Sequence, residues 1–159
     1  MSDPIQSQYP VDYNQCYGCG QFNPAGLHIE SIWEGDVCVC RFTPGPQHMA
    51  VPGFVYGGLL ASLIDCHSIA AASTLSADLV GEFIGGPIQR FVTAALKVDY
   101  LHPTPLGPEL IVRATGTPLS PRKVQVVSEL SAGGPVCVRG EVLAVRLPDT
   151  MAGPVQPAD

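Results

Sequence analysis

The sequence predicts an α+β fold in which an antiparallel sheet of about six strands wraps around one long central helix. From Gly57 onward, a run of leucine, isoleucine and alanine is apolar on nearly every face, which is typical of a buried helix. Asp65 is the only charge in the predicted helix. Two short strand-like segments precede the helix, and four segments of alternating apolar and polar residues follow it. With 159 residues, of which 46% are hydrophobic, the chain can bury one core.

Turn residues divide the chain into an arm, one domain and a tail. Residues 43–56 contain three prolines and two glycines and predict a loop. The glycine-rich residues 78–90 surround Phe83 and Ile84 and form either a lid or a binding loop, unless these side chains simply pack. The predicted parts are an irregular arm at 1–26, a domain at 27–147 and a Pro-rich tail at 148–159. Within the domain we expect a hairpin of strands at 27–33 and 37–42, a helix from 57 to between 76 and 79, and strands at 91–101, 109–117, 123–130 and 136–147.

Charge and composition exclude several kinds of partner. The net charge is −6 and only 8 lysines and arginines are present, which argues against nucleic acid, because phosphate binding depends on clustered basic residues. The sequence gives no sign of a membrane partner. It shows no basic amphipathic stripe, no N-terminal leader with a basic and then an apolar region, and no uncharged apolar run of about 18 residues. We therefore expect a cytoplasmic location.

The six cysteines are expected to be free thiols, since a chain with this much core does not need disulfides. Cys16-Tyr-Gly-Cys19-Gly is the one spacing typical of a metal site. A structural zinc site normally requires a second pair of ligands, and the histidines are scattered along the chain. The sequence thus predicts no metal, and a tight turn with two small thiols at this place.

The start of the predicted helix carries the main chemical signal. Gly57 and Gly58 allow a ligand to approach the backbone closely, and the N–H groups at a helix start are unpaired and at the positive end of the helix dipole. Such groups can stabilise a developing oxyanion. A diglycine is often only a turn, and a buried acid is often structural, but their combination with Asp65 indicates a site that polarises a carbonyl beside a carboxylate.

Several motifs together resemble those of a known family. They are Cys16-Tyr-Gly-Cys-Gly with Asn23-Pro-Ala-Gly-Leu27, His48 with Pro52-Gly53 before Tyr56-Gly-Gly, Leu63-Ile-Asp65, and Val98-Asp-Tyr-Leu-His-Pro103. In order and spacing they resemble the hotdog-fold acyl-CoA thioesterases, especially the phenylacetate-pathway and human thioesterase-superfamily group. The resemblance implies hydrolysis of acyl-coenzyme A thioesters, with coenzyme A as part of the substrate and no other cofactor. It assigns Asp65 to activating water or attacking directly, and the glycine N–H to polarising the thioester carbonyl.

One residue departs from the family pattern, which usually has His-Gly-Gly where this chain has Tyr56-Gly-Gly. A phenol can donate a hydrogen bond, but it is bulkier than imidazole and is uncharged near neutral pH. Two functions therefore remain open: an acyl-CoA thioesterase, and a catalytically silent hotdog protein that binds acyl-CoA or a similar ligand. A dehydratase is less favoured, because no histidine accompanies the acid as it would require. We predict that Tyr56 is a tolerated replacement.

Further residues are candidates for contact with the substrate. Gln47 and His48 precede the diglycine, where the family often has a polar residue directed at the carbonyl or water. Ser68 is near the expected face of the acid and either bonds to the carboxylate or back-bonds to a helix carbonyl. Arg122 and Lys123 occupy a turn where the family often binds the coenzyme phosphates, and in an acidic chain they are the best anion site, although such turns are often only solvated.

Helix geometry predicts an oligomer. Gly57 and Asp65 are eight residues apart, about 12 Å along a helix, whereas the oxyanion donor and the acid must both lie about 3 Å from one reacting group. They do not easily serve one thioester within one chain. In a two-fold dimer with antiparallel helices, the glycine end of one chain faces the acid of the other. We expect a homodimer or a dimer of dimers.

Overall fold

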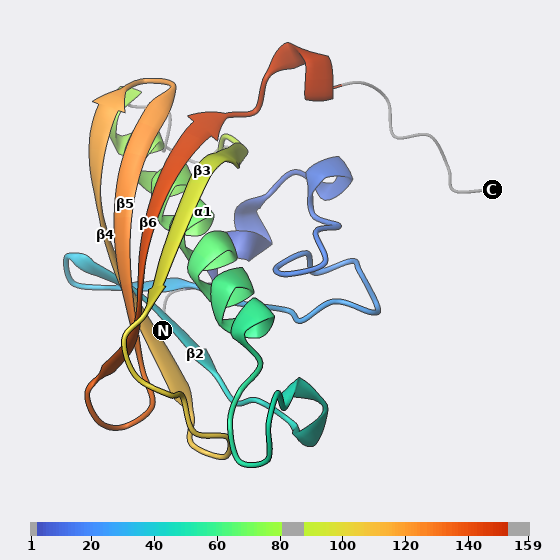
Figure 1. Ribbon diagram of the computed structural model, residues 1–159. Coiled ribbons are helices and arrows are strands. Elements are labelled where there is room, and N and C mark those ends of the chain that lie inside the picture. The colour runs from blue at the N-terminus through green and yellow to red at the C-terminus, as the bar shows by residue number, and fades with distance from the viewer. Residues whose placement is uncertain (1–2, 81–87, 153–159) are drawn as a thin grey trace.

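A computed structural model of the chain describes residues 3–80 and 88–152. One helix and six strands carry the fold (Figure 1). They are β1 (Ile32–Glu34), β2 (Val37–Phe42), α1 (Gly57–Val80), β3 (Phe91–Tyr100), β4 (Leu110–Ser120), β5 (Lys123–Ser131) and β6 (Val136–Arg146). Short 3₁₀ turns lie at Ile5–Gln8, Val11–Tyr13, Pro46–His48 and Asp149–Met151.

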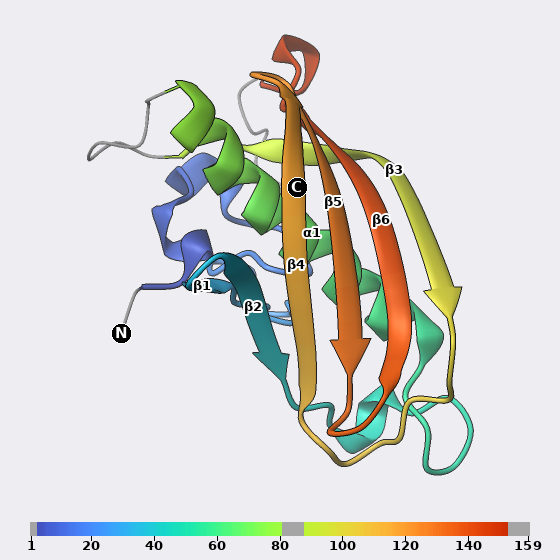
Figure 2. The ribbon, with the colours of Figure 1, turned by 90° about the vertical axis from the view of Figure 1, so that its left-hand side faces the viewer.

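The strands form one sheet of six, in the order β1-β2-β4-β5-β6-β3, and every neighbouring pair is antiparallel. β3 pairs with β6 along its length, so it lies at one edge of the sheet although it precedes β4 in the chain. Figure 2 shows the sheet curving around α1. The α+β architecture predicted from the sequence is confirmed.

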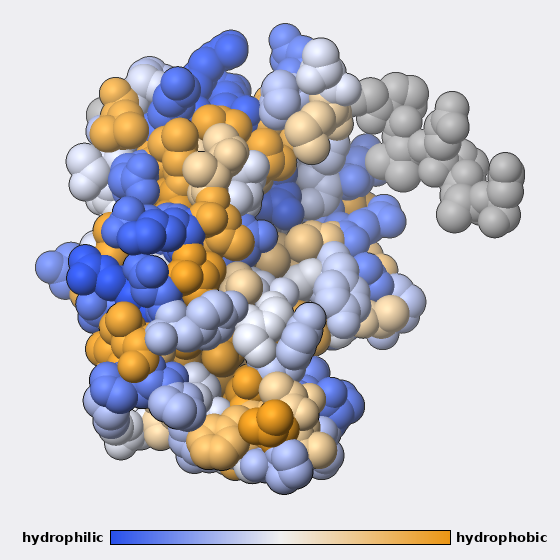
Figure 3. All heavy atoms as spheres, in the orientation of Figure 1, coloured by the Kyte–Doolittle hydropathy of each residue, from blue (hydrophilic) through white to orange (hydrophobic). Residues whose placement is uncertain are grey.

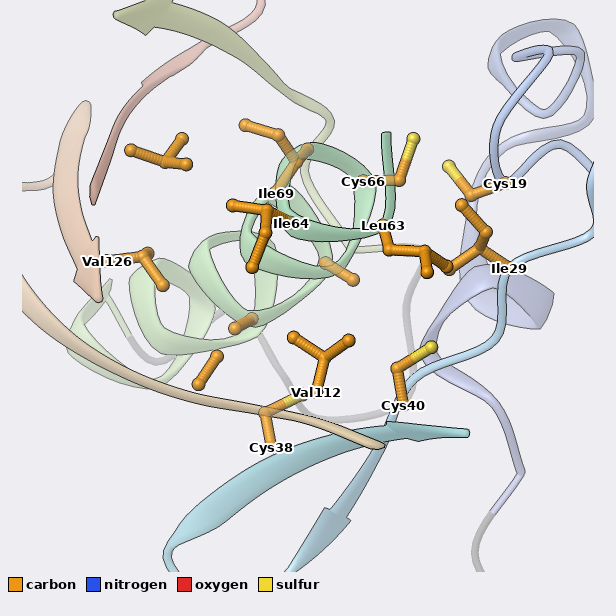
Figure 4. Packing of buried hydrophobic residues seen from close by; sticks show 14 of the residues in the cluster. Cys19, Ile29, Cys38, Cys40, Leu63, Ile64, Cys66, Ile69, Val112 and Val126 are labelled. Atoms are coloured by element: carbon orange, nitrogen blue, oxygen red, sulfur yellow. The ribbon is translucent and has the colours of Figure 1, made fainter. Parts of the chain in front are cut away.

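α1 is central because its side chains fill the concave face of the sheet. Leu63 and Ile64 are fully buried, and they share one core with Val112 of β4 and Val126 of β5 (Figure 4). Close approach of the helix to β6 depends on Gly140, because a Cβ at this position would collide with Cγ2 of Ile64. By length and composition the segment Gly57–Leu75 is also apolar enough to cross a membrane, but most of it is buried inside the fold, as in a core helix.

The arm is packed more tightly against the domain than its turn-rich sequence indicates. Ile5, Tyr9 and Cys19 belong to the hydrophobic core. The N–H groups of Leu27 and Ile29 donate to the carbonyls of Tyr17 and Gly18, rather than to the neighbouring strand. The predicted strand at 27–33 is therefore wrong for residues 27–31, because the arm takes their backbone hydrogen bonds and β1 begins only at Ile32.

Two other boundaries differ from the expectation. α1 continues to Val80 and so includes a second acid, Asp78, in its last turns; Asp65 is not the only charge in the helix. β4 continues through Pro118 to Ser120, because a register shift between these residues accommodates the proline. Of the loop expected at 78–90, residues 81–87 lie outside the described residues.

Candidate active site

Asp65 lies two turns into α1, beside the edge strand β3. Its Oδ1 accepts a hydrogen bond from the hydroxyl of Thr93, and the side chain is half-buried. Burial raises the pKa of the Asp65 carboxyl above its usual value, and the nearby Cys16 sulfur adds to the rise. The hydrogen bond from Thr93 and the charge of Arg90 lower this pKa and so oppose the rise. A poorly solvated carboxylate is a stronger base than one in water, so this environment suits proton abstraction.

The first turn of α1 presents unpaired backbone donors. The Tyr56 carbonyl accepts from Leu59 N at 3.1 Å and from Leu60 N at 3.3 Å, so the helix starts directly after Tyr56. Within residues 3–80 and 88–152, the N–H groups of Gly57 and Gly58 have no acceptor, as expected at a helix start. These two donors are available to a carbonyl or oxyanion.

Two tyrosines enclose this diglycine. The Tyr100 hydroxyl donates to the Gly57 carbonyl at 2.8 Å, and its ring would lie 3.5 Å from a Cβ at Gly57. The ring of Tyr56 covers Gly58 so closely that a Cβ there would collide with it. Tyr56 is itself 57% exposed and lines a cavity, so its side chain is accessible to a ligand.

A cavity of about 470 Å³ lies at the glycine end of the helix. Its lining includes two of the predicted substrate contacts, Gln47 and His48, together with Tyr56 and Gly58. Nδ1 of His48 accepts from Gly45 N at 2.9 Å, which leaves Nε2 as the ring nitrogen free to donate. Tyr17, Leu27, Leu59 and Ser62 complete the wall.

The acid lies in a different and smaller cavity of about 170 Å³. Asp65 and Thr93 line it with Arg90 and the thiols of Cys16 and Cys66, and no residue is shared with the cavity at the glycine end. Within one chain, the described residues therefore do not bring the acid and the glycine donors to one ligand. This arrangement agrees with the 12 Å separation expected from the helix rise.

Ser68 is not placed where the sequence reasoning expected it. It is fully buried and hydrogen-bonded to Ser128 of β5 at 2.7 Å, so it faces the sheet and does not contact the acid. Thr93, on a strand, occupies the place beside the carboxylate. The neighbouring His67 is buried and structural: Ser31 Oγ and its Nδ1 are 2.8 Å apart, and its Nε2 is 3.1 Å from the Cys38 carbonyl. Burial lowers the pKa of His67 to about 4.

The basic residues are divided between surface and interior. Arg122 and Lys123 are exposed at the turn between β4 and β5. Lys123 pairs with Val145, which pairs in turn with Val92 of β3, so this turn lies at the end of the sheet nearer Thr93. Arg90 is instead largely buried, with its guanidinium 4.3 Å above the Tyr9 ring and its Nε donating to the Tyr13 carbonyl.

All six cysteines are free, as the sequence predicts. The fold nevertheless adds Cys66 of α1 to the pair Cys16 and Cys19, and Figure 4 shows the sulfurs of Cys19 and Cys66 directed toward one another. Hydrogen bonds from Cys19 and Cys66 lower the pKa of the Cys16 thiol, and hydrogen bonding to Cys16 raises the pKa of Cys19 to about 11. Cys16 is the thiol of this cluster that ionises first.

Comparison with known proteins agrees with this architecture. The sequence profile described as "Thioesterase superfamily" matches residues 52–138, which include α1, β3, β4, β5 and the start of β6. The chain belongs to the thioesterase superfamily. A solved thioesterase superfamily protein from Shewanella loihica PV-4 is 41% identical, with a TM-score of 0.65 over 86% of this chain and 96% of that one. The hotdog fold expected from the sequence motifs is thereby confirmed.

Other relatives are similar over less of their length or only in fold. The acyl-coenzyme A thioesterase THEM4 of Xenopus laevis is 38% identical over 86 residues, which cover 54% of this chain and 33% of that protein. The match thus covers only about a third of the length of that protein. The PaaI protein of the Escherichia coli phenylacetic acid degradation operon is 18% identical, with a TM-score of 0.62 over 77% of this chain and 81% of that one, and shows the fold alone.

Two contacts of the site were missed by the sequence reasoning. Thr93 and Tyr100 stand at opposite ends of β3 and touch Asp65 and Gly57. The alternating pattern of the strand predicts which face of the sheet each residue lies on. It does not predict which helix residue each one contacts, because that depends on how the helix crosses the sheet.

Proposed function

We propose that this protein hydrolyses acyl-coenzyme A thioesters. The observation that carries the proposal is the half-buried Asp65 carboxylate on the core helix, held by Thr93 and opening on a cavity. Membership of the thioesterase superfamily and similarity to a protein named acyl-coenzyme A thioesterase support this reaction class. The reaction requires no cofactor beyond the coenzyme A of the substrate.

In the proposed mechanism, Asp65 takes a proton from a water molecule as that water attacks the thioester carbonyl carbon. The carbonyl oxygen becomes an oxyanion and accepts hydrogen bonds from the unpaired N–H of Gly57, in line with its position at the positive end of α1. The C–S bond then breaks, the proton passes to the coenzyme thiolate, and the free acid leaves. Gln47, His48 and Tyr56 are proposed to contact the acyl end, and Arg122 with Lys123 the coenzyme phosphates.

The site is proposed to be shared between two chains. β3 is a ten-residue edge strand whose middle, Thr93–Lys97, is exposed. Apolar side chains form a band over β3 and α1 in Figure 3, and Leu96, Tyr100 and Leu101 of this region are 42%, 54% and 51% exposed. A long edge with apolar side chains favours pairing with a second copy. A two-fold axis across the middle of β3 would bring the Thr93 end of one chain to the Tyr100 end of its partner.

Turnover of a panel of acyl-CoAs, followed by release of free thiol, tests the function. Asp65→Asn should keep the fold and lower turnover by a factor on the order of 10² or more, as expected when a base is removed. Ser68→Ala is a matched control on the same helix, since Ser68 faces the sheet. If the Asp65→Asn variant is as active as the parent, Asp65 is not the catalytic base.

Mixing variants tests the shared site. Asp65→Asn chains and Gly57→Pro chains are each expected to be inactive alone. In a random mixture half of the dimers contain one of each, and one of their two sites is intact, so about a quarter of the parent activity should return. No recovery after subunit exchange, or a parent that is an active monomer in sedimentation, would contradict the composite site.

The second candidate function is a silent protein that binds acyl-CoA, and the exposed Tyr56 beside the diglycine is the observation that favours it. Tyr56→Phe distinguishes the roles of this residue. Lost turnover with intact binding would assign catalysis to the hydroxyl, and little change would assign packing. If the parent binds acyl-CoA, releases no thiol from any member of the panel and gains activity on Tyr56→His, the silent binder is the correct function.

A further inference from the structure

The thiol cluster beside the acid has the dimensions of a metal site. The Sγ atoms of Cys16, Cys19 and Cys66 all lie within 4.8 Å of one another, and those of Cys16 and Cys66 are 3.9 Å apart. In a tetrahedral zinc site with Zn–S bonds of about 2.3 Å, two sulfurs are separated by about 3.8 Å. The three sulfurs therefore need to move by about 1 Å or less to form one face of such a tetrahedron.

The loop that carries two of these thiols is shaped around the third. A Cβ at Gly18 would collide with Sγ of Cys66, and a Cβ at Gly20 would collide with the backbone at Cys16. Gly20 N donates to the Cys16 carbonyl at 2.8 Å, which closes the turn that carries both thiols of the arm.

The charge around the cluster suits a divalent ion. Three thiolates and one divalent cation leave a net charge of −1, which a neighbouring cation would balance. Arg90 lines the same cavity, and its Nη1 is buried without a hydrogen-bond partner in the described part of the chain. A buried guanidinium N–H without an acceptor is costly, and a thiolate would supply one.

We propose that Cys16, Cys19 and Cys66 bind one zinc ion, which fastens the N-terminal arm to α1 beside Asp65. The sequence predicted no metal here because only the Cys16 and Cys19 pair is visible in it, and the fold supplies the third ligand. The fourth position opens on the 170 Å³ cavity, which has room for a water molecule. Asp65 is engaged by Thr93, so solvent and not this carboxylate is assigned to that position. The ion does not depend on the proposed thioesterase activity.

Metal content and cobalt binding test the site. The full chain, without a histidine tag, is purified with a reductant that does not chelate metal, and zinc per chain is measured by elemental analysis. Metal-free protein is then titrated with Co²⁺, whose visible absorption is strong in tetrahedral thiolate sites and weak in water. We expect one ion per chain and a saturable cobalt spectrum with thiolate-to-metal charge transfer.

Variants separate this site from other thiols. Cys66→Ala and Cys16→Ser should each lower cobalt affinity at least tenfold, whereas Cys137→Ala should bind like the parent, because Cys137 is buried on β6 outside the cluster. Chelation of zinc should lower the Tm of the parent and of Cys137→Ala. A reduced parent that holds no zinc and shows no cobalt spectrum would overturn the proposal, and this result does not depend on any variant folding. Undiminished cobalt binding by a folded Cys66→Ala would also overturn it.

Discussion

Replacing Gly57 by proline removes one backbone N–H without disturbing the helix, and so tests the role of that donor. Gly57 is the first residue of α1, where proline is favoured because this N–H has no helical partner and the ring fixes a helical φ. No hydrogen bond within the described residues is lost, because the Gly57 N–H has no acceptor there. Its carbonyl still accepts from Tyr100, whose ring leaves ordinary contact distance for a Cβ. The Tm of Gly57→Pro should therefore stay close to that of the parent.

Activity should fall sharply if this N–H stabilises the oxyanion. Removal of one such donor costs about 10² to 10³ in kcat, or about 2.7–4 kcal/mol. Gly57→Ala is the matched control, since it adds a Cβ next to Tyr100 but keeps the N–H. The assay is free-thiol release from the best acyl-CoA of the panel, with kcat and KM measured separately. A Gly57→Pro variant that turns over as fast as Gly57→Ala would refute the role of this donor.

Three further predictions concern residues around the site and the core. Thr93→Val should lower kcat about tenfold, whereas Thr93→Ser should keep the kcat of the parent, since the hydroxyl positions the Asp65 carboxylate. Equal activity of the parent and both variants would exclude this role. Replacing Arg122 and Lys123 by alanine should raise KM for acyl-CoA and leave hydrolysis of a short thioester without the nucleotide unchanged; equal losses with both substrates would make the turn structural. Gly140→Ala should lower the free energy of unfolding by about 1–3 kcal/mol, with less than additive loss when combined with Ile64→Ala; an unchanged Tm would contradict the close packing.

Periodicity predicted most of the fold because it reports directly on burial. The all-round apolar run after Gly57 predicted a core helix, and the alternation after residue 90 predicted strands with one buried face, as the structure has them. It failed at residues 27–31, where an apolar segment bonds to the arm, since a sequence pattern does not name the partner of a backbone hydrogen bond. It also failed at the end of α1, because no proline or glycine stops the helix before Val80.

The sequence by itself determined the local chemistry: glycine N–H groups at a helix start, an acid two turns later, and a fixed rise between them. These depend on residues close together in the chain, whose separation the helix sets. Only the tertiary structure decided which side chains meet them. Thr93 rather than Ser68 holds the acid, Tyr100 contacts Gly57, and Cys66 joins Cys16 and Cys19. These pairs are separated by 28 to 50 residues, and they depend on how the helix lies across the sheet and on where the arm folds back, which no local pattern encodes.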